Sequence, residues 1–405
     1  MRNFFGFSVV VLIMLLVYGV ILYKITSMEN YTYFFCGIGG VGMNGLAQIV
    51  LAQGHTVAGS DRGYDMGLEP EKYRTLTQLG VTLYPQDGSG VTQTRPDFFV
   101  VSTAVEETIP DVKAAKEAGV RIIHRSDLLT ELTQHHTLMT VGGTSGKSTT
   151  SAMLAHIMVE TGFSPTVMSG AAVVGQPNKG VSNARLGTGD VAVIEVDESD
   201  RSIAKAVPDI AVLNNISMDH KSMDELRQMF GDYLGAARKG VVVNLDCPES
   251  MGLASEFEKT LREQTLGKKA VTFSLNPPEE NAPENAFGKK GADFYATNID
   301  PQADGISFYL NGEIPVKLAV FGRFNVANAL AAIAAASLAG VTTVAAAKAL
   351  ESFCGTKRRL EHLGTQNGVT VIDDFAHNPH KIAATLKAFK EYPGRLFVVY
   401  QPHGF

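Results

Sequence analysis

The feature that most constrains this chain is a glycine-rich turn between an apolar strand and a helix. The strand is predicted at 137–141, and the turn is Gly143-Thr144-Ser145-Gly146-Lys147-Ser148-Thr149. Glycines let backbone N–H groups converge on phosphate oxygens, the lysine reaches the terminal phosphates, and the serine hydroxyl holds Mg²⁺. The first glycine of the usual spacing would fall at Val141, so the pattern is met only in its second half. We therefore expect an ATP-binding loop in a parallel α/β domain.

A second glycine turn lies nearer the N-terminus. A strand ending at Cys36 leads into a turn in which Gly37, Gly39 and Gly42 match the G-x-G-x-x-G fingerprint, and Asp61 follows nineteen residues after Gly42. This pattern by itself predicts NAD binding, but the same backbone geometry cradles any diphosphate. An NAD-dependent dehydrogenase and a UDP-sugar-binding enzyme are both open, and the separate ATP-binding loop favours the UDP-sugar.

Two polar strand ends follow the ATP-binding loop in the sequence. Glu195 ends an apolar strand and is followed by the acidic residues of 197–200, and Asp219-His220 follows the next strand. A carboxylate at the end of a strand beside a phosphate loop is typical of a Mg²⁺ ligand. Oxygen ligands suit Mg²⁺ better than imidazole does, so a structural role is the alternative for His220.

Alternating strands and helices predict that both turns belong to parallel, doubly wound α/β sheets. The pattern that starts at Tyr31 restarts near His135, which marks a boundary. A polar, proline-rich stretch at 275–291 indicates a surface loop. The predicted strands after the first turn are 55–58, 98–102, 120–124, 137–141, 190–196, 209–215, 240–245 and 270–275, with a hairpin at 305–316 and an alanine-rich helix at 325–341.

A third segment opens near Lys357, with a predicted strand at 369–375, a helix at 379–390 and a strand at 395–400. The sequence stops at Phe405, so we expect this Rossmann-like α/β domain to be incomplete. The predicted division is an apolar leader at 1–27 followed by domains at 28–135, 136–356 and 357–405.

Composition excludes other classes of protein. The 405 residues carry 35 Lys and Arg against 41 Asp and Glu, and the net charge of −6 gives no general reason to bind nucleic acid. The three cysteines form no CxxC pair, which favours a reducing compartment.

Residues Phe4 to Tyr23 are uncharged and long enough to span a bilayer. Either this leader anchors the chain to the inner face of the membrane or Met28 is the functional start, and in both cases we expect the rest in the cytoplasm.

Ten short motifs occur in an order that resembles the Mur ligase family, from Tyr31 to His403. They are GIGGVGM, GSD, STAV, GGTSGKSTT, EVDESD, NNISMDH, FGRFNVANALAAIA, FCGTKRRLE, DDFAHNP and QPH. The resemblance implies a three-domain architecture and is greatest to the branch that joins L-alanine to the carboxylate of UDP-N-acetylmuramate. The implied chemistry is ATP-dependent amide formation through an acyl phosphate, in peptidoglycan precursor synthesis, by a monomer or a homodimer.

The resemblance also implies roles for particular residues. Lys147, Glu195 and His220 would be catalytic, with Ser148, Glu195 and His220 organising Mg²⁺. His377 and His403 would lie near the incoming amino acid. The UDP-sugar would be lined by Gly37, Gly39, Gly40, Val41, Gly42, Asp61, Ser102 and Thr103. ATP would be bound by residues Gly143 to Thr149 and by Asn325, Asn328, Arg359 and Asp374.

Several positions depart from the family pattern. Ser145 stands where the family usually has His or Asn, Phe324 replaces a His, and Gly404 replaces an arginine typical of the alanine-adding branch. Gly235 stands where other branches carry a lysine, which agrees with that branch. Ser199 also favours it over the ligase that recycles the murein tripeptide, where Tyr is expected. The tripeptide-recycling ligase and an inactive nucleotide-binding scaffold remain the alternatives.

Overall fold

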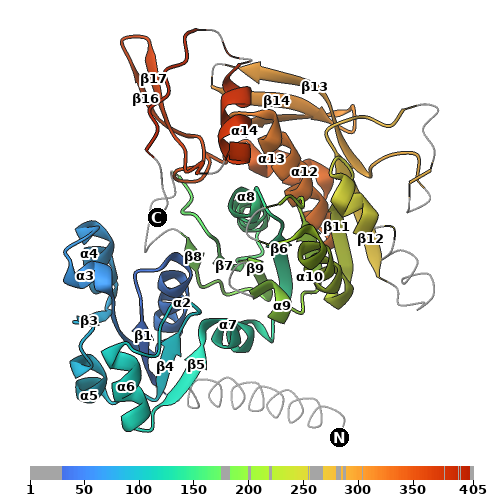
Figure 1. Ribbon diagram of the computed structural model, residues 1–405. Coiled ribbons are helices and arrows are strands. Elements are labelled where there is room, and N and C mark those ends of the chain that lie inside the picture. Colours follow the sequence, from blue (N-terminus) through green and yellow to red (C-terminus); the bar gives the residue numbers. More distant parts are fainter. Residues whose placement is uncertain are drawn as a thin grey trace, which may run out of the picture.

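The computed structural model describes residues 30–174, 183–198, 202–218, 221–253, 255, 268–279, 284–285, 289–302, 304–377, 379–390, 392 and 394–401. Their elements form a five-stranded sheet, a ten-stranded sheet and a two-stranded hairpin, which follow one another along the chain (Figure 1). Within these residues, no helix is long and apolar enough to cross a membrane. The apolar leader Phe4 to Tyr23 lies outside them.

The five-stranded sheet is parallel throughout, as predicted, with strand order β3-β2-β1-β4-β5. The central strand β1 is buried on both faces, which is why it is almost continuously apolar. Its strands are β1 (Thr32–Cys36), β2 (Thr56–Ser60), β3 (Thr82–Tyr84), β4 (Phe98–Val101) and β5 (Arg121–His124). Its helices are α2 (Val41–Ala52), α3 (Arg62–Asp65), α4 (Pro70–Leu79), α5 (Ser89–Thr94), α6 (Pro110–Glu117) and α7 (Arg125–Thr133).

The ten-stranded sheet has the order β15-β14-β13-β12-β11-β10-β6-β9-β7-β8. It is parallel from β7 to β13, as predicted for its centre, and antiparallel at both ends. Its strands are β6 (Thr137–Gly142), β7 (Thr166–Met168), β8 (Ala184–Arg185), β9 (Val191–Glu195), β10 (Ile210–Leu213), β11 (Gly240–Asn244), β12 (Lys269–Ser274), β13 (Phe294–Gln302), β14 (Gly305–Leu310) and β15 (Ile314–Leu318). Its helices are α8 (Lys147–Glu160), α9 (Ser202–Lys205), α10 (Met223–Ala236), α12 (Arg323–Leu338) and α13 (Thr343–Leu350).

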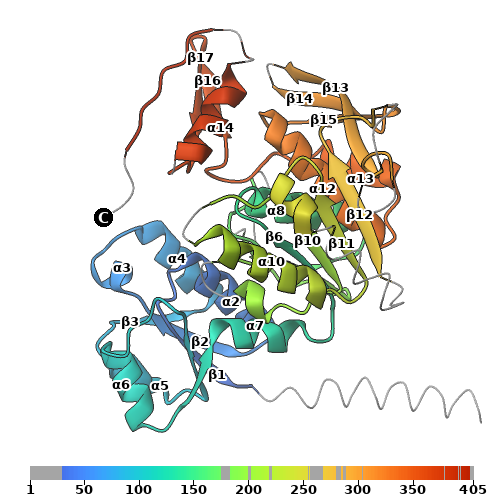
Figure 2. The same ribbon diagram turned by 45° about the vertical axis from the view of Figure 1, so that its right-hand side comes forward.

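Helices cover both faces of this sheet (Figure 2). On one face α8 packs against the alanine-rich α12, whose Ala331 to Ala336 are fully buried. On the other face Phe230 and Tyr233 of α10 pack against alternate residues of the same strands. That second core is continuous with apolar residues of β1 and α2, so the two sheets share part of one core. The shared core fixes the two glycine turns relative to each other.

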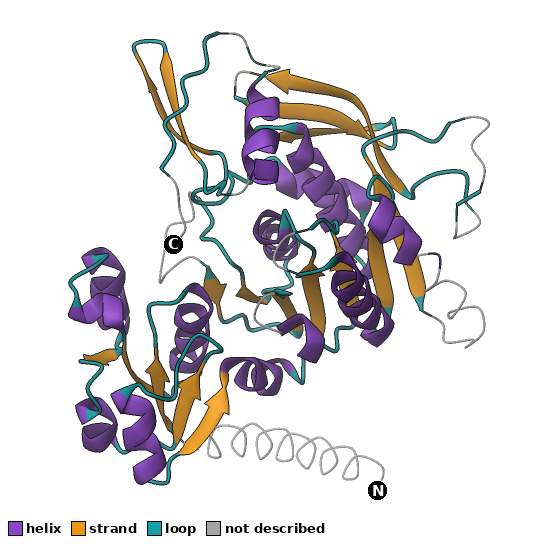
Figure 3. Cartoon of the chain, in the orientation of Figure 1, coloured by secondary structure: helices purple, strands orange, loops and turns teal. Residues whose placement is uncertain are grey.

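The third segment departs from its prediction. The strand predicted at 369–375 is present as β17 (Val369–Asp373), but it pairs antiparallel with β16 (Glu361–Gln366), so the described part forms no parallel sheet here. The helix α14 (Pro379–Phe389) is confirmed. The strand predicted at 395–400 was wrong: its residues form no ladder, and Val399 is fully exposed. An apolar segment needs a neighbouring strand to pair its backbone, and the described residues supply none beside it (Figure 3).

Candidate active site

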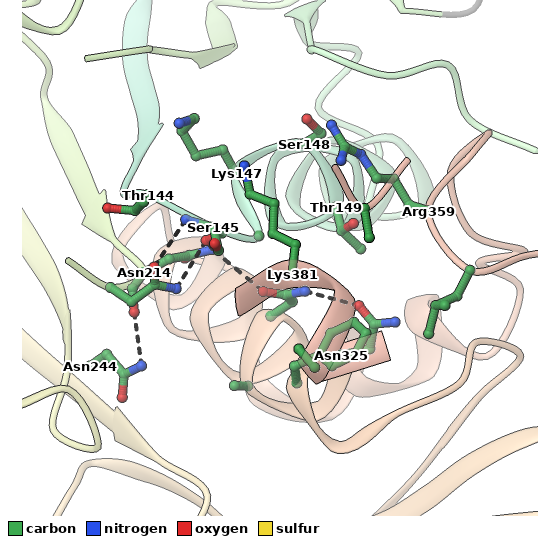
Figure 4. A pocket seen from close by; sticks show the side chains of 18 of the residues that line it. Thr144, Ser145, Lys147, Ser148, Thr149, Asn214, Asn244, Asn325, Arg359 and Lys381 are labelled. Carbon is green, nitrogen blue, oxygen red and sulfur yellow. Dashed lines mark hydrogen bonds between the residues drawn. The ribbon is translucent and has the colours of Figure 1, made fainter. Parts of the chain in front are cut away.

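A cavity of about 520 Å³ lies where the turn before α8 meets the ends of the central strands, the start of α12 and the third segment. Figure 4 shows side chains from these segments converging on it. Parallel strands place their carboxyl ends at one edge of a sheet, which is where α/β proteins bind ligands. The predicted residues that line the cavity are Thr144, Ser145, Gly146, Lys147, Ser148, Thr149, Glu195, Asn325, Asn328, Arg359, Asp374 and His377. Gly143 belongs to the same turn but does not line the cavity.

The turn before α8 is held from behind by the end of β10. Asn215 accepts the N–H of Thr144 at its carbonyl oxygen (3.0 Å) and the N–H of Ser145 at Oδ1 (2.9 Å). Gly146, the residue directly before α8, has a left-handed φ of 82°, and a Cβ there would lie 2.4 Å from Asn328 Oδ1. No side chain caps α8, so the N–H groups of its first turn are available to an anion.

Lys147 is surrounded by carboxylates at the cavity wall. Its Nζ donates to Glu198 Oε2 at 2.8 Å and lies 3.1 Å from Asp197 Oδ2. The side chains of Lys147 and Glu198 are only 10% and 9% exposed. Burial lowers the pKa of Lys147, but Asp197, Glu198 and Glu195 together outweigh it, so its pKa lies above the ordinary value. The lysine therefore keeps its positive charge at neutral pH. An incoming phosphate would replace Glu198 and Asp197 as its partner.

Glu195 ends β9 beside Ser148, as the sequence predicts for a pair of Mg²⁺ ligands. Ser148 Oγ donates to Glu195 Oε1 at 3.1 Å, and the N–H of Gly170 donates to Oε2 at 2.5 Å. Burial raises the pKa of the Glu195 carboxyl, although Gly170, Lys147 and Ser148 oppose this shift. A buried carboxylate and a hydroxyl at one point supply hard oxygen donors, so they fit Mg²⁺ once phosphate oxygens and water complete its shell. His220 lies outside the described residues.

The predicted asparagines of α12 reach the cavity but also form the wall around it. Asn328 Nδ2 donates to Asn325 Oδ1 at 2.9 Å, and Asn325 Nδ2 donates to the carbonyl of Phe321 at 2.8 Å. Asn328 Oδ1 accepts from Thr150 Oγ1 at 3.1 Å. These bonds fix the orientation of both amides in the cavity wall.

The third segment closes the opposite side of the cavity. The carboxylate of Asp374 accepts the N–H of Leu360 at 3.2 Å and the hydroxyl of Thr385 at 2.5 Å. Arg359 lies between Arg358 and Leu360, which both adopt left-handed backbone with φ of 57° and 50°. Arg359 lines the cavity, and in the view of Figure 4 its side chain lies beside those of Ser148 and Thr149. His403 lies outside the described residues.

The first glycine turn lies outside this cavity lining. Asp61 Oδ2 accepts the N–H of Gly39 at 2.8 Å, and its Oδ1 accepts the N–H of Gly63 at 2.7 Å and the hydroxyl of Tyr73 at 2.8 Å. Asp61 therefore anchors the turn itself. The remaining predicted residues of this group, Gly37, Gly40, Val41, Gly42, Ser102 and Thr103, lie after β1 and after its neighbour β4, at the same edge of the sheet.

Other polar residues line the cavity that the sequence did not single out. Asn214 and Asn215 directly follow β10, Asn244 ends β11, and Lys381 comes from α14. Figure 4 shows Lys381 extending toward the turn before α8. The paired asparagines at the end of an apolar strand were the available signal, since a polar residue at that edge faces the site.

Three family models match the chain in succession. They are described as the Mur ligase family catalytic domain, the Mur ligase middle domain and the Mur ligase glutamate ligase domain. The matched residues are 32–137, 141–336 and 358–403, respectively.

Curated relatives match over most of the chain. The UDP-N-acetylmuramate–L-alanine ligase of Bifidobacterium longum subsp. infantis is 35% identical over 382 residues, covering 92% of this chain and 73% of that protein. The ligase of the same name from Carboxydothermus hydrogenoformans is 34% identical over 382 residues, covering 92% and 76%.

Solved structures agree with these matches. A UDP-N-acetylmuramate–alanine ligase from Thermotoga maritima superposes with a TM-score of 0.72 at 26% identity, covering 89% of this chain and 78% of that one. A murein peptide ligase from Psychrobacter arcticus gives a TM-score of 0.70 at 27% identity, covering 90% and 77%.

Proposed function

The chain belongs to the Mur ligase family, and we propose that it joins L-alanine to the carboxylate of UDP-N-acetylmuramate with consumption of ATP. The observation that carries this proposal is the cavity in which Lys147, Ser148 and Glu195 meet at an uncapped helix N-terminus. Relatives that share about a third of the sequence carry the name of this activity. The product is a precursor of peptidoglycan.

The proposed reaction makes an amide from a carboxylate that cannot acylate an amine directly. The carboxylate oxygen attacks the γ-phosphorus of ATP, the bond to ADP breaks, and an acyl phosphate forms. The amine of alanine then attacks the acyl carbon, loses a proton, and displaces inorganic phosphate. Catalysis of this kind depends mainly on positioning the reactants and on neutralising charge.

We assign the charge neutralisation to the phosphate-binding turn. Lys147 would leave Glu198 and Asp197 and contact the transferring phosphate, while the first turn of α8 binds the neighbouring oxygens. Ser148, Glu195 and His220 would hold Mg²⁺, which would offset the negative charge of the phosphates. From α12 and the third segment, Asn325, Asn328, Arg359 and Asp374 would contact adenine, ribose and phosphates.

The UDP-sugar and the amino acid are assigned to two other places, the first glycine turn and the surroundings of His377. The UDP part would lie at the first glycine turn, with Gly39 to Gly42, Asp61 and the Ser102-Thr103 turn around it. The amino acid would enter beside His377, which lines the cavity, and His403. We keep the divisions near residues 135 and 356 as proposed domain boundaries, because each of the three sheets falls within one of these segments.

A murein peptide ligase is the second candidate, because such an enzyme superposes almost as well as the alanine ligase does. Both would act on the same UDP-sugar and differ in the acceptor. Ser199 and Gly404 bear on this choice, and both lie outside the described residues.

The test is phosphate release from ATP and Mg²⁺ with UDP-N-acetylmuramate, against a panel of amino acids and the murein tripeptide. The chain would start at Met28, and the products would be identified by mass. We expect turnover with L-alanine and a product heavier by one alanine residue. Turnover with the tripeptide alone would favour the second candidate. If no acceptor gives turnover while ATP and the UDP-sugar still bind, the chain is a nucleotide-binding protein and not a ligase.

A further inference from the structure

Arg125 lies directly against the first glycine turn, although it follows that turn by many residues in the sequence. It begins α7 at the end of β5, and an ideal Cβ on Gly42 would lie 1.9 Å from Arg125 Nη1 and 2.9 Å from its Cζ. The guanidinium therefore occupies the space that a side chain at position 42 would need. Only a glycine at position 42 allows this arginine to lie over the turn.

The guanidinium of Arg125 is charged and half-buried, which favours binding of an anion. Burial lowers the pKa of the guanidinium and the carboxylate of Asp197 raises it, but an arginine remains charged in either case. A half-buried charge faces less competition from water, so its hydrogen bonds to an anion are stronger than at the surface.

Backbone donors lie at the same place. The helix α2 begins after Gly40, and no side chain caps its first turn, which contains Gly42. The first N–H groups of a helix have no partner within the helix and favour an anion. The guanidinium and these N–H groups thus lie at the same glycine turn.

The arginine also lies on the side of the turn that faces the cavity. Asp197, which interacts with Arg125, lies 3.1 Å from Lys147 Nζ. Independently, Asn183 Nδ2 donates to the carbonyl of Val41 at 3.2 Å and to that of Ser169 at 3.3 Å. The next residue, Gly170, donates to Glu195. A ligand that extends past Arg125 is therefore directed toward the phosphate-binding turn.

We propose that Arg125 is a binding residue for the diphosphate of the sugar nucleotide and orients its sugar toward Lys147. This inference rests on the proposed function, since it assumes a nucleoside diphosphate at the first glycine turn. Two parallel N–H groups of the guanidinium would pair with phosphate oxygens, while the first turn of α2 binds the opposite side. The role is one of binding and positioning, since Arg125 does not line the cavity where the phosphate transfers.

The test is direct binding, by calorimetry on the chain from Met28, of UDP, uridine, UDP-N-acetylmuramate and ATP. The variant Arg125→Met removes the guanidinium and keeps an unbranched apolar stem. We expect the dissociation constant of UDP to rise roughly tenfold to a hundredfold, with uridine and ATP unchanged. The matched control is Arg121→Met at the other end of β5, where the side chain is 65% exposed and pairs with Glu131.

The outcomes separate this role from the others. Unchanged UDP affinity in Arg125→Met overturns it, and so does weaker binding of UDP-N-acetylmuramate alone, which would mean that the arginine binds the carboxylate. Failure of the unmodified chain to bind UDP or the UDP-sugar would overturn the proposed function as well.

A second variant tests the geometry without touching the arginine. Gly42 has ordinary helical backbone, so Gly42→Ala keeps the helix but forces the guanidinium to move. We expect Gly42→Ala to weaken UDP binding, and to add little when combined with Arg125→Met, because both remove one interaction. Fully additive losses would mean that the two residues act separately and would overturn the proposal.

Discussion

The two glycine turns begin in the same way and are surrounded by different side chains. Each follows a buried parallel strand, each leads into a helix without a side-chain cap, and each has its backbone fixed from behind by a polar side chain. At the first turn that side chain is Asp61, and at the second it is Asn215. The cation Arg125 lies against the first turn, whereas at the second turn Lys147 lies among the carboxylates Asp197, Glu198 and Glu195.

The comparison shows how a glycine turn before a helix can be used either for binding alone or for binding and reaction. Backbone N–H groups at a helix start are enough to hold an anion. Transferring a phosphoryl group also needs a cation beside the phosphate and a carboxylate that can bind a metal, and among the described residues Lys147 and Glu195 supply these at the second turn. We therefore propose that the first turn holds its ligand and that the second takes part in the reaction.

The largest expected effect follows from removing the cation of the second turn. In Lys147→Met the transferring phosphate loses its charged partner, and we expect kcat to fall by roughly 10²- to 10³-fold. Phosphate release at saturating substrates measures this. Lys205→Met, at a lysine that is 44% exposed and paired with Asp127, is the control and keeps full activity. A loss of less than about tenfold in Lys147→Met would contradict the division between the two turns.

Replacing Glu195 should lower the activity but raise the stability of the folded chain. We expect Glu195→Gln to lower turnover by about 10²-fold and to raise the Mg²⁺ concentration needed for half-maximal rate. Because burial raises the pKa of this carboxyl in the folded chain, folding is favoured when it is protonated, and that stability is lost as pH rises through the folded pKa. Without Mg²⁺, the glutamine variant should therefore be more resistant to urea at neutral pH.

The stability gain of Glu195→Gln should shrink as pH falls and should vanish below the ordinary pKa of 4.5, where the carboxyl becomes protonated in the unfolded chain as well. Urea unfolding at neutral pH and below this pKa measures this change. A variant that is less stable than the unmodified chain at neutral pH would show that the bonds from Ser148 and Gly170 outweigh burial.

A smaller effect, confined to binding and stability, is expected at the first turn. Asp61→Asn weakens the bonds that Asp61 accepts from Gly39, Gly63 and Tyr73, and we expect it to lower the free energy of unfolding by about 1.5–3 kcal/mol. The KM for the UDP-sugar should rise while kcat stays nearly constant. Tyr73→Phe removes one of the three bonds and should cost about 1 kcal/mol. A fall in kcat at unchanged KM would place Asp61 in the reaction.

The smallest expected effect lies in the helices behind the turns. The helix α2 contains no titratable side chain, whereas α8 contains His156, which is buried against Ala349 and Ser352. Burial lowers the pKa of His156, so below its ordinary pKa of 6.5 the unfolded chain binds a proton that the folded chain does not.

The contribution of His156 to stability is present above pH 6.5 and is lost as pH falls toward the folded pKa. We expect His156→Gln to reduce the loss of unfolding free energy between about pH 8 and pH 6 by about 1 kcal/mol. Urea unfolding at both pH values measures it. An unchanged pH dependence would show that His156 titrates normally.

The sequence predicted the parts of the fold that depend on local pattern. The parallel strands, both glycine turns and the helices behind them were confirmed, because apolar runs between glycines specify buried strands wherever they occur. The strand at 395–400 was wrong, although its residues are as apolar as those of β11, because pairing depends on a neighbour and not on composition. The parallel sheet expected around it failed for the same reason.

The candidate site was predictable where chemistry and local pattern coincide. Lys147, Ser148 and Glu195 were singled out from a loop and a strand end, and the structure brings them to one cavity. Arg125 was missed and Glu198 was noted only as part of an acidic run, because what they contact is set by how the segments pack together. An arginine at the start of a helix has no local signature of its target, which becomes evident only when α7 is placed against α2.

The walls of the cavity also set an order in time. They come from segments that leave the ribosome in sequence, first the turn before α8, then the ends of β9 and β10, then α12, and last the residues around Arg359 and Asp374. Chains fold from the N-terminus during synthesis. A partly synthesised chain thus has the phosphate-binding turn but lacks part of the cavity wall. The complete cavity can form only after the residues around Arg359 and Asp374 have been translated.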